Sequence, residues 1–236
     1  MQRIAIIECG TVPQGLQARH GRYPGMFNQA LDSAAKGRLR FDALSPVSGD
    51  PLGNPADFDG YLLTGSRHGV NDQLEWMAPL QAFIREAARI GKPQVGICFG
   101  HQIIASAFGA PIVKAANGWG CGIQSYDFSG PVQETGAFPV PVFHQDQVAA
   151  PPENADVIAG NAFCPVGGLL YRSGPVLSYQ FHPEFSRTYL QDLINDCRGR
   201  IMTDEDARQG HASLANYRNT DRFMTTIADF LAKAKT

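Results

Sequence analysis

The sequence of 236 residues has no long apolar run, no basic cluster and no excess of charge. No stretch approaches the roughly 20 apolar residues that span a bilayer, and the apolar run before Glu8 is too short for a signal peptide. A cytoplasmic protein is therefore expected. The formal charge of −2 gives no reason to expect a nucleic acid or a membrane surface as a partner.

Cysteine is scarce as well, and the arrangement of the cysteines argues against two kinds of site. The five cysteines are odd in number and include no CxxC pair, so neither a disulfide framework nor a zinc knuckle is indicated. A phosphate-binding, glycine-rich loop is also missing. Four of the thiols are expected to be small buried side chains, whereas Cys98 stands in a glycine-rich motif.

The first half of the chain alternates strand and helix patterns. Short apolar runs predict strands over 3–7, 39–44, 61–63 and 94–97. Helical periodicity predicts helices over 74–90 and 101–108. This alternation favours parallel βαβ units in a doubly wound sheet, where ligands bind at the carboxyl ends of the strands.

The second half has shorter strand patterns separated by glycine and proline. Strands are predicted over 123–128, 140–143, 157–159, 168–171 and 176–181. A hairpin turn at 170–176 adds an antiparallel section, and helices are expected over 189–194 and 220–232. We therefore expect one α/β domain over 1–236. Its doubly wound, mostly parallel sheet is flanked by helices, carries the antiparallel section and ends in C-terminal helices over 189–236.

The most informative segment, residues 96–102, reads Gly-Ile-Cys-Phe-Gly-His-Gln and completes a predicted strand. A Gly-x-Cys-x-Gly motif in this position is the thiol form of the nucleophile elbow, a sharp turn between strand and helix. Gly96 and Gly100 lack a Cβ atom, so the helix can approach the strand closely. Cys98 would project from the turn at the helix N-terminus, whose dipole stabilises a thiolate.

A second motif, His-Pro-Glu at 182–184, supplies a base and an acid two positions apart. His182 follows the apolar run 176–181, and strand ends line the crevice of α/β folds. Pro183 holds the turn so that Glu184 can return to the imidazole, where a carboxylate fixes the tautomer and supports the imidazolium. The order Cys, His, Glu differs from the acid-before-histidine order of α/β-hydrolases.

A third segment, 62–69, reads Leu-Leu-Thr-Gly-Ser-Arg-His-Gly and follows the third predicted strand. Glycine-rich turns at such a position expose backbone N–H groups to a developing oxyanion. The second donor would be the N–H of Phe99, the residue after the nucleophile.

Together, the motifs at 96–102 and 182–184 resemble the class I (triad-type) glutamine amidotransferase family, and the resemblance extends from the first strand to about residue 190. It implies a flavodoxin-like fold, no cofactor and no metal. It also implies Cys98 as nucleophile, His182 as general base and acid, and Glu184 as the orienting acid. Within the family, Cys-Phe-Gly-His-Gln, residues 23–27 and His-Gln-Asp-Gln-Val resemble the stand-alone, GMP-synthase-like amidotransferases, among which stand the plant γ-glutamyl peptidases.

The resemblance further implies how a substrate is held. Gln102 matches the family glutamine that helps to hold the substrate amino acid, and Gln145 and Asp146 belong to a segment similar to the family's His-x-Asp-x-Val loop. Gly65 and Ser66 match the oxyanion loop, although Thr-Gly-Ser-Arg replaces the commoner Gly-Gly-Pro type of sequence.

The implied reaction is hydrolysis of a γ-glutamyl amide, from glutamine to glutamate and ammonia through a γ-glutamyl thioester. Because the chain has no second domain that could use ammonia, an accepting synthetase must be a separate chain. The alternative is a γ-glutamyl peptidase, and a rival of another class is a catalytically silent binding or regulatory module. A metal hydrolase built from the histidines at 101, 144 and 182 with Glu184 lacks a recognisable ligand spacing.

Overall fold

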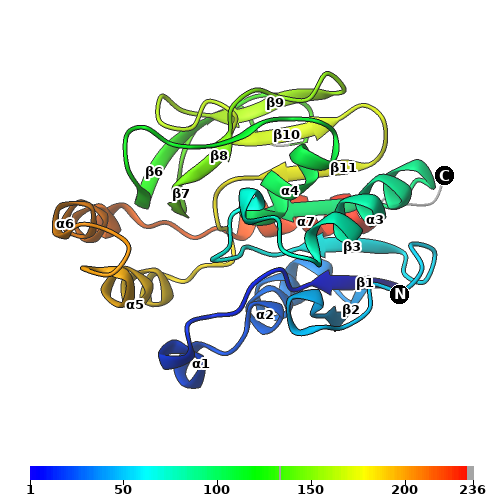
Figure 1. The fold of residues 1–236 in the computed structure, drawn as a ribbon, viewed down its shortest axis with the longest axis horizontal. Coiled ribbons are helices and arrows are strands. Elements are labelled where there is room, and N and C mark those ends of the chain that lie inside the picture. The colour runs from blue at the N-terminus through cyan, green and yellow to red at the C-terminus, as the bar shows by residue number, and fades with distance from the viewer. Residues whose placement is uncertain (133, 233–236) are drawn as a thin grey trace.

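The computed structural model describes residues 1–132 and 134–232 as a nine-stranded sheet, a two-stranded sheet and flanking helices (Figure 1). The strands are β1 (Gln2–Ile7), β2 (Leu39–Leu44), β3 (Gly60–Leu63), β4 (Gln94–Ile97), β5 (Ile112–Lys114), β6 (Gly120–Phe128), β7 (Gly136–His144), β8 (Asp146–Val148), β9 (Ala155–Gly160), β10 (Gly168–Tyr171) and β11 (Val176–Tyr179). The α-helices are α1 (Gln14–His20), α2 (Tyr23–Ala35), α3 (Met77–Arg89), α4 (Phe99–Ala107), α5 (Arg187–Cys197), α6 (Asp204–Ser213) and α7 (Asp221–Ala232).

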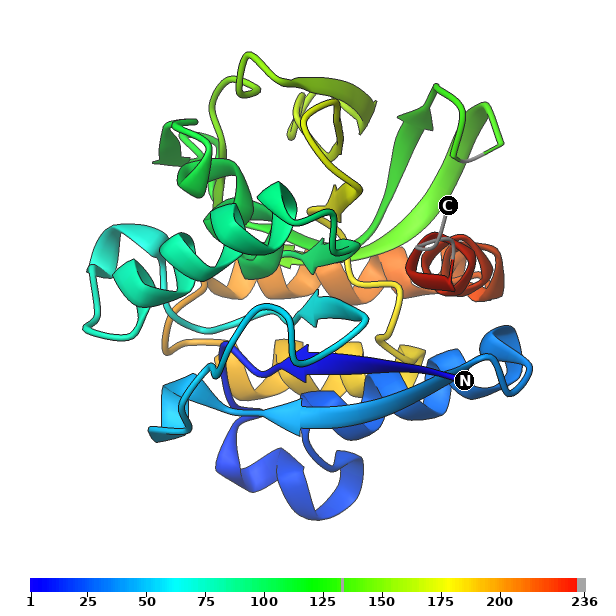
Figure 2. The same ribbon diagram turned by 90° about the vertical axis from the view of Figure 1, so that its right-hand side faces the viewer.

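The large sheet has a parallel part and an antiparallel part, in the order β2-β1-β3-β4-β11-β10-β9-β6-β7. Strands β1 to β4 and β11 pair in parallel, whereas β10, β9, β6 and β7 pair antiparallel. Strand β11 therefore joins the two parts. Figure 2 shows the N-terminal strands below and the antiparallel strands above. This arrangement confirms the predicted mostly parallel sheet with an added antiparallel section.

The inner parallel strands are buried because both of their faces are covered, whereas β2, at the edge of the sheet, is only partly buried. In β1, Ile4 and Ile6 join a core with residues of α2 and α7, while Ala5 and Ile7 join a second core with residues of α3 and α4. Successive side chains of a strand point to opposite faces, so a strand between two helical layers needs apolar residues at every position.

Two predicted helices begin at other residues in the structure. Helix α3 begins at Met77, because Pro79 lacks an N–H group and is tolerated only in the first turn. Leu74 lies in the preceding loop, where it packs against the core. Helix α4 begins at Phe99, directly after the elbow residue, and its first turn was therefore missed by the prediction over 101–108.

Two helices in the first half were not predicted at all. Helix α1 has no buried residue, so its sequence carries no apolar periodicity. Helix α2 buries Phe27 and Leu31 and has a proline in its first turn, a signal that could have been found. None of the described helices is long and apolar enough to cross a membrane.

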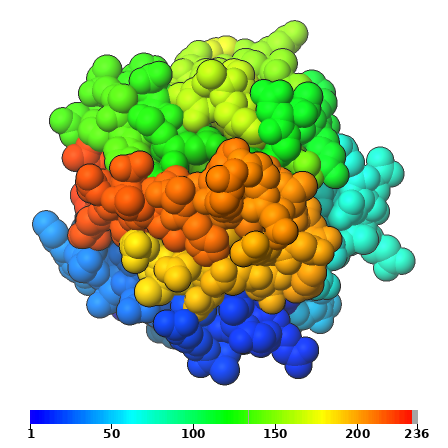
Figure 3. All heavy atoms as spheres, turned by 90° about the vertical axis from the view of Figure 1, so that its left-hand side faces the viewer, coloured from blue at the N-terminus to red at the C-terminus, as the bar shows by residue number. Residues whose placement is uncertain are grey.

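The segment 195–215 contains helix α6, which the patterns over 189–194 and 220–232 did not predict. Helix α6 packs on β6, where a Cβ atom on Gly210 would lie 2.7 Å from Sγ of Cys121. Figure 1 shows α1, α5 and α6 at the end of the molecule opposite the N-terminus. In Figure 3 the orange residues of this segment lie between the green antiparallel part and the blue N-terminal segment.

Candidate active site

The turn that carries Cys98 has the geometry of a nucleophile elbow. Cys98 lies between β4 and α4 with φ 54° and ψ −103°, a left-handed backbone that L-residues rarely adopt. A Cβ atom on Gly96 would lie 2.5 Å from the carbonyl oxygen of Gly100, and one on Gly100 would lie 2.4 Å from that of Leu63. Both glycines are therefore required for the close approach of helix to strand, as the motif predicts.

His182 reaches the same edge of the sheet from the neighbouring strand. Strand β11 pairs with β4 so that Tyr179 lies opposite Ile97, and the N–H of Cys98 donates to the carbonyl of Tyr179 at 2.8 Å. The strand ends at Tyr179 rather than at the predicted residue 181. The N–H of His182 donates instead to Pro141 of β7 at 2.8 Å, which attaches the turn to the antiparallel part.

Glu184 lies behind the imidazole of His182. Its Oε1 atom is 2.8 Å from Nδ1 of His182, and both side chains are buried. The ring of Phe185 stacks on the imidazole, with ring centroids 3.9 Å apart and planes 8° from parallel. The carboxylate and the stacked ring together set the tautomer and orientation of His182, which leaves Nε2 for a reacting partner.

Cys98 and His182 interact electrostatically. Burial alone lowers the pKa of His182, but electrostatic interaction with Cys98 and then with Glu184, together with the hydrogen bond to Glu184, raises this pKa well above its ordinary value. A proton is thus favoured on the imidazole beside Cys98. In general, an imidazolium next to a cysteine favours the thiolate, which is the activated form of the nucleophile.

The 64–67 loop lies against this pair. A Cβ atom on Gly65 would lie 2.8 Å from Cε1 of His182 and 3.7 Å from Cβ of Cys98. Ser66 lines the cavity, and its Oγ accepts a hydrogen bond from the N–H of His68 at 3.0 Å. Within the described residues, no protein acceptor bonds the N–H of Ser66 or of Phe99. Both N–H groups are therefore free to bind an oxyanion.

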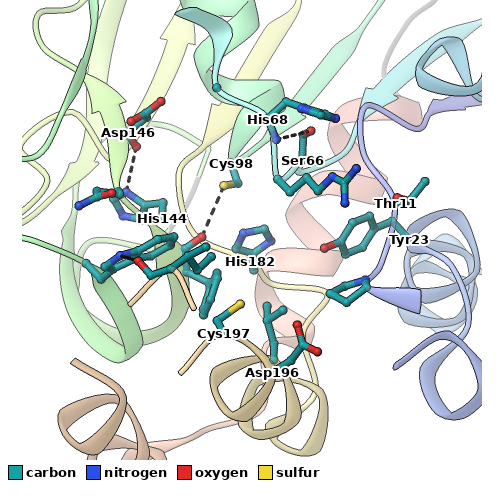
Figure 4. Close-up of a pocket in the computed structure, with 18 of the residues that line it drawn as sticks. Thr11, Tyr23, Ser66, His68, Cys98, His144, Asp146, His182, Asp196 and Cys197 are labelled. Atoms are coloured by element: carbon teal, nitrogen blue, oxygen red, sulfur yellow. Dashed lines mark hydrogen bonds between the residues drawn. The ribbon is translucent and has the colours of Figure 1, made fainter. Parts of the chain in front are cut away.

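These groups open onto a cavity of ≈ 930 Å³. Figure 4 shows Cys98 and His182 near its centre, with His144 and Asp146 to the left, Thr11 and Tyr23 to the right, and Asp196 and Cys197 below. Of the predicted site residues, the cavity wall contains Cys98, His182, Ser66, Gln102, Gln145 and Asp146. Glu184 and Gly65 stand behind this wall, and the ring of Phe99 packs against Trp76 with centroids 5.6 Å apart.

The predicted substrate loop is connected to the helix of the elbow. Nε2 of Gln102 donates to the carbonyl of Asp146 at 2.7 Å and to Oε1 of Gln180 at 3.1 Å. Nδ1 of His144 lies 3.1 Å from the same carbonyl, and burial lowers the pKa of His144 to about 3. Burial raises the pKa of Asp146, which Lys114 across the β5–β8 pair opposes.

The side of the cavity next to α5 was not predicted as part of the site. It is formed by residues brought together from α5, the turn after α5 and the turn before β6: Trp119, Leu193, Asp196, Cys197, Arg200 and Ile201. Nε1 of Trp119 donates to the carbonyl of Ile201 at 3.1 Å, which holds the indole ring in place. The Gly-Trp turn at 118–119 is the only local signal for this wall in the sequence.

Five residues with basic side chains in the two segments 19–22 and 67–68 divide into two groups in the structure. Arg67 and His68 line the cavity. Arg22 instead pairs with the buried Glu8, and Arg19 and His20 both bind Asp192, at 2.6 and 2.7 Å. The second group therefore attaches the α1–α2 segment to the sheet and to α5.

The alternative of a metal site finds no support in the described part of the chain. No group of three or more potential ligands there could hold a metal ion. The ring nitrogens of His101 lie 2.8 Å from Oγ of Ser178 and 3.1 Å from the carbonyl of Val166, so both are already occupied. Burial lowers the pKa of His101 to about 4, which suits a neutral structural histidine.

Comparisons with known proteins agree with the family resemblance and the predicted fold. The family model described as glutamine amidotransferase class-I matches residues 52–197. Gamma-glutamyl peptidase 3 of Arabidopsis thaliana is 25% identical over 214 residues, which cover 86% of this chain and 86% of the relative. A glutamine-hydrolyzing GMP synthase subunit of Thermoplasma acidophilum is 28% identical over 146 residues, which cover 60% of this chain and 71% of the relative.

A solved structure gives an independent view of the fold. The crystal structure of a glutamine amido transferase from Methylobacillus flagellatus superposes with a TM-score of 0.75 at 19% identity, covering 99% of this chain and 95% of the other. The predicted fold class is therefore confirmed.

Proposed function

The chain belongs to the class I glutamine amidotransferase family, and on that premise we propose that it hydrolyses γ-glutamyl amides with Cys98 as the nucleophile. Relatives named as γ-glutamyl peptidase and as glutamine-hydrolyzing GMP synthase support amide hydrolysis in general. The observation that carries the proposal is the strained Cys98 beside the buried His182–Glu184 pair, at the ends of two neighbouring parallel strands.

Acylation begins from the thiolate of Cys98 and the imidazolium of His182. The sulfur attacks the γ-carbonyl carbon, and the carbonyl electron pair moves to oxygen, where the N–H groups of Ser66 and Phe99 donate to it. As the oxygen re-forms the carbonyl, the bond to the leaving nitrogen breaks and Nε2 of His182 gives its proton to that nitrogen. The products are the free amine and a γ-glutamyl thioester.

Deacylation follows the same path with water. Neutral His182 takes a proton from water, the resulting hydroxide attacks the thioester carbonyl, and the same N–H groups bind the second oxyanion. Collapse of this intermediate releases glutamate and restores the thiolate beside the imidazolium. Glu184 keeps the imidazole oriented and supports its positive charge throughout. Water and the chain's own groups suffice for this route, and no cofactor is invoked.

The side of the cavity with Asp146 would hold the glutamyl part of the substrate. A carboxylate in a half-buried position suits an α-ammonium group, and the amide side chains of Gln102 and Gln145 supply further hydrogen bonds. Gln102 also holds the carbonyl of Asp146, which keeps this side of the site in a fixed position relative to the elbow helix.

The leaving group would lie on the side of His182, because the general acid must face the nitrogen that it protonates. Trp119 and Ile201 line the same cavity, and Ile201 is 56% exposed. The cavity thus continues well beyond the space that ammonia needs. This observation favours the second candidate function, a γ-glutamyl peptidase that acts on γ-glutamyl peptides or conjugates, over a glutaminase that supplies ammonia to a separate synthetase.

The proposal is tested by labelling and hydrolysis with the same preparation. The wild type and Cys98→Ala are treated with a diazo-ketone analogue of glutamine and weighed by intact-protein mass spectrometry. Glutamate release from glutamine and from γ-glutamyl dipeptides is measured in parallel. We expect one label on the wild type, none on the variant, and faster hydrolysis of the dipeptides. Faster hydrolysis of glutamine would favour the glutaminase, and no labelling with no hydrolysis would favour a binding module.

A further inference from the structure

Thr64 is a fully buried residue at the junction of β3 and the 64–67 loop, and all of its polar groups are engaged. Its hydroxyl accepts a hydrogen bond from the N–H of Cys9 at 3.0 Å and donates to the carbonyl of Gly65 at 3.0 Å. Its own N–H donates to Ile7 at 3.0 Å, and its carbonyl accepts from Gly100 at 3.2 Å. Thr64 therefore connects β1, the loop and the first turn of α4.

The hydroxyl of Thr64 determines the direction of the Gly65–Ser66 peptide unit. In a planar trans peptide, the carbonyl of Gly65 and the N–H of Ser66 point in opposite directions. Because Thr64 holds the carbonyl of Gly65 on its own side, the N–H of Ser66 must point away from Thr64. With the oxyanion route as premise, we propose that Thr64 is the positioning residue that aims the Ser66 N–H at the substrate oxyanion.

The segment after β1 restrains the loop as well. A Cβ atom on Gly10 would lie 2.5 Å from Cα of Ser66, so the segment after β1 touches the loop directly. The N–H of Cys9, one residue earlier, is the donor that orients the Thr64 hydroxyl toward Gly65. The loop is thus held between two contacts, of which only the Thr64 hydroxyl can be removed without a change of shape.

Thr64 also relates the two oxyanion donors to each other. Its carbonyl binds the N–H of Gly100, the residue after Phe99, while its hydroxyl binds the peptide that carries the Ser66 N–H. The distance between the N–H groups of Ser66 and Phe99 therefore depends on Thr64. Thr64 does not belong to the cavity wall, so it acts through Ser66 and Phe99 rather than by contact with substrate.

The experiment compares Thr64→Val, which has the same shape without a hydroxyl, with Thr64→Ser, which keeps the hydroxyl. Turnover of a γ-glutamyl dipeptide is measured beside the rate at which iodoacetamide alkylates Cys98, a substitution reaction that forms no oxyanion. We expect kcat to fall roughly 10- to 100-fold in Thr64→Val, with KM changed less than about threefold. Removal of one oxyanion donor lowers kcat roughly 10²- to 10³-fold, and a donor that points in the wrong direction should lose part of that contribution.

In the same variant the alkylation rate should stay near the wild-type value, and Thr64→Ser should keep kcat within about threefold of it. Equal losses of turnover and alkylation in Thr64→Val, equal losses in the two variants, or an unchanged kcat in Thr64→Val would each overturn the assignment.

Crystal structures of the wild type and Thr64→Val separate this inference from the proposed function. A wild type that hydrolyses no γ-glutamyl compound would end the proposed reaction. The orientation of the Gly65–Ser66 peptide would still decide the role of Thr64. A rotated peptide in Thr64→Val supports the positioning role, and an unmoved one overturns it.

Discussion

The parallel and antiparallel parts of the sheet contribute different things to the candidate site. The parallel part supplies Cys98 after β4 and the 64–67 loop after β3, and β11 at the seam leads to His182. The antiparallel part supplies the turn between β7 and β8, with Gln145 and Asp146. All the proposed reacting groups thus follow parallel strands. Of the groups proposed to hold the substrate, Gln145 and Asp146 come from the antiparallel side and Gln102 comes from α4.

This division has a geometric cause. Parallel strands all end at one edge, so consecutive strands bring their following loops together at the same place. Antiparallel strands alternate in direction, so only every second connection reaches that edge. The antiparallel part therefore offers one substrate loop, which Gln102 attaches to the helix of the elbow through the carbonyl of Asp146.

The largest expected effect distinguishes the thiol of Cys98, in the parallel part, from the thiol of Cys164, in the antiparallel part. Cys98→Ala should lower kcat roughly 10⁴- to 10⁶-fold, as loss of a nucleophile does in other acyl-transfer enzymes. Cys164→Ala, which removes a buried thiol of the antiparallel part, should lower the melting temperature but leave kcat within about threefold. The measurements are steady-state kinetics and thermal unfolding. A similar loss of turnover in both variants would contradict the division.

Glu184→Gln tests the His182–Glu184 pair, which follows β11 where the two parts of the sheet meet. The substitution should lower kcat roughly 10²- to 10⁴-fold. The thiolate–imidazolium pair exists only while His182 keeps its proton, so it is lost as the pH rises through the raised pKa of His182. Removing the carboxylate charge removes one cause of that raised pKa. The alkaline limb of the kcat/KM profile should therefore move to lower pH, and a limb that stays in place would exclude Glu184 from this role.

Gly65→Ala introduces a methyl group into the parallel part of the site. Its Cβ atom would lie 2.8 Å from Cε1 of His182, so the loop or the imidazole must move. A displacement of this kind should lower kcat roughly 10²-fold. Gly25→Ala is the matched control, because nothing lies within 4 Å of a Cβ atom there and Gly25 does not line the cavity. Equal turnover in Gly65→Ala and the control would show that the loop is not closely fitted to His182.

Gln102→Leu tests the connection between the two parts. It removes the hydrogen bonds to the carbonyl of Asp146 and to Gln180, so the substrate loop loses its attachment to α4. We expect KM to rise about tenfold, the equivalent of one buried hydrogen bond, with a smaller change in kcat. Alkylation of Cys98 by iodoacetamide should be unchanged. A fall in the alkylation rate would mean that the elbow itself had been disturbed.

The smallest effect concerns the leaving-group side. Trp119→Ala should lower kcat/KM roughly fivefold for a γ-glutamyl dipeptide with an apolar second residue, because apolar contact area is lost. Hydrolysis of glutamine, whose leaving group is ammonia, should be unaffected. The comparison requires both substrates with both proteins. An equal loss for the two substrates would place Trp119 outside the leaving-group side.

Sequence patterns predicted the parallel part best. The strand over 94–97 matches the structure residue for residue, since a strand buried along its whole length forms a continuous run without turn residues. The predictions over 39–44, at the edge of the sheet, and over 168–171, in the antiparallel part, match as well. Helix α1 was missed because it buries no residue, and the start of α3 was set by Pro79 rather than by its apolar period. In the antiparallel part, β7 runs over 136–144, well beyond the predicted 140–143, because pairing with β6 along its length extends it.

The sequence by itself determined the features that depend on near neighbours. The glycines around Cys98 allow the strained turn, and the Pro183 turn lets Glu184 meet the ring of His182 at 2.8 Å. Tertiary structure alone decided which distant segments complete the cavity. Trp119 contacts Ile201, 82 positions later, through a hydrogen bond of 3.1 Å. Apolar periodicity reports that a residue is buried, but only the packing of the sheet and α5 determines what it is buried against.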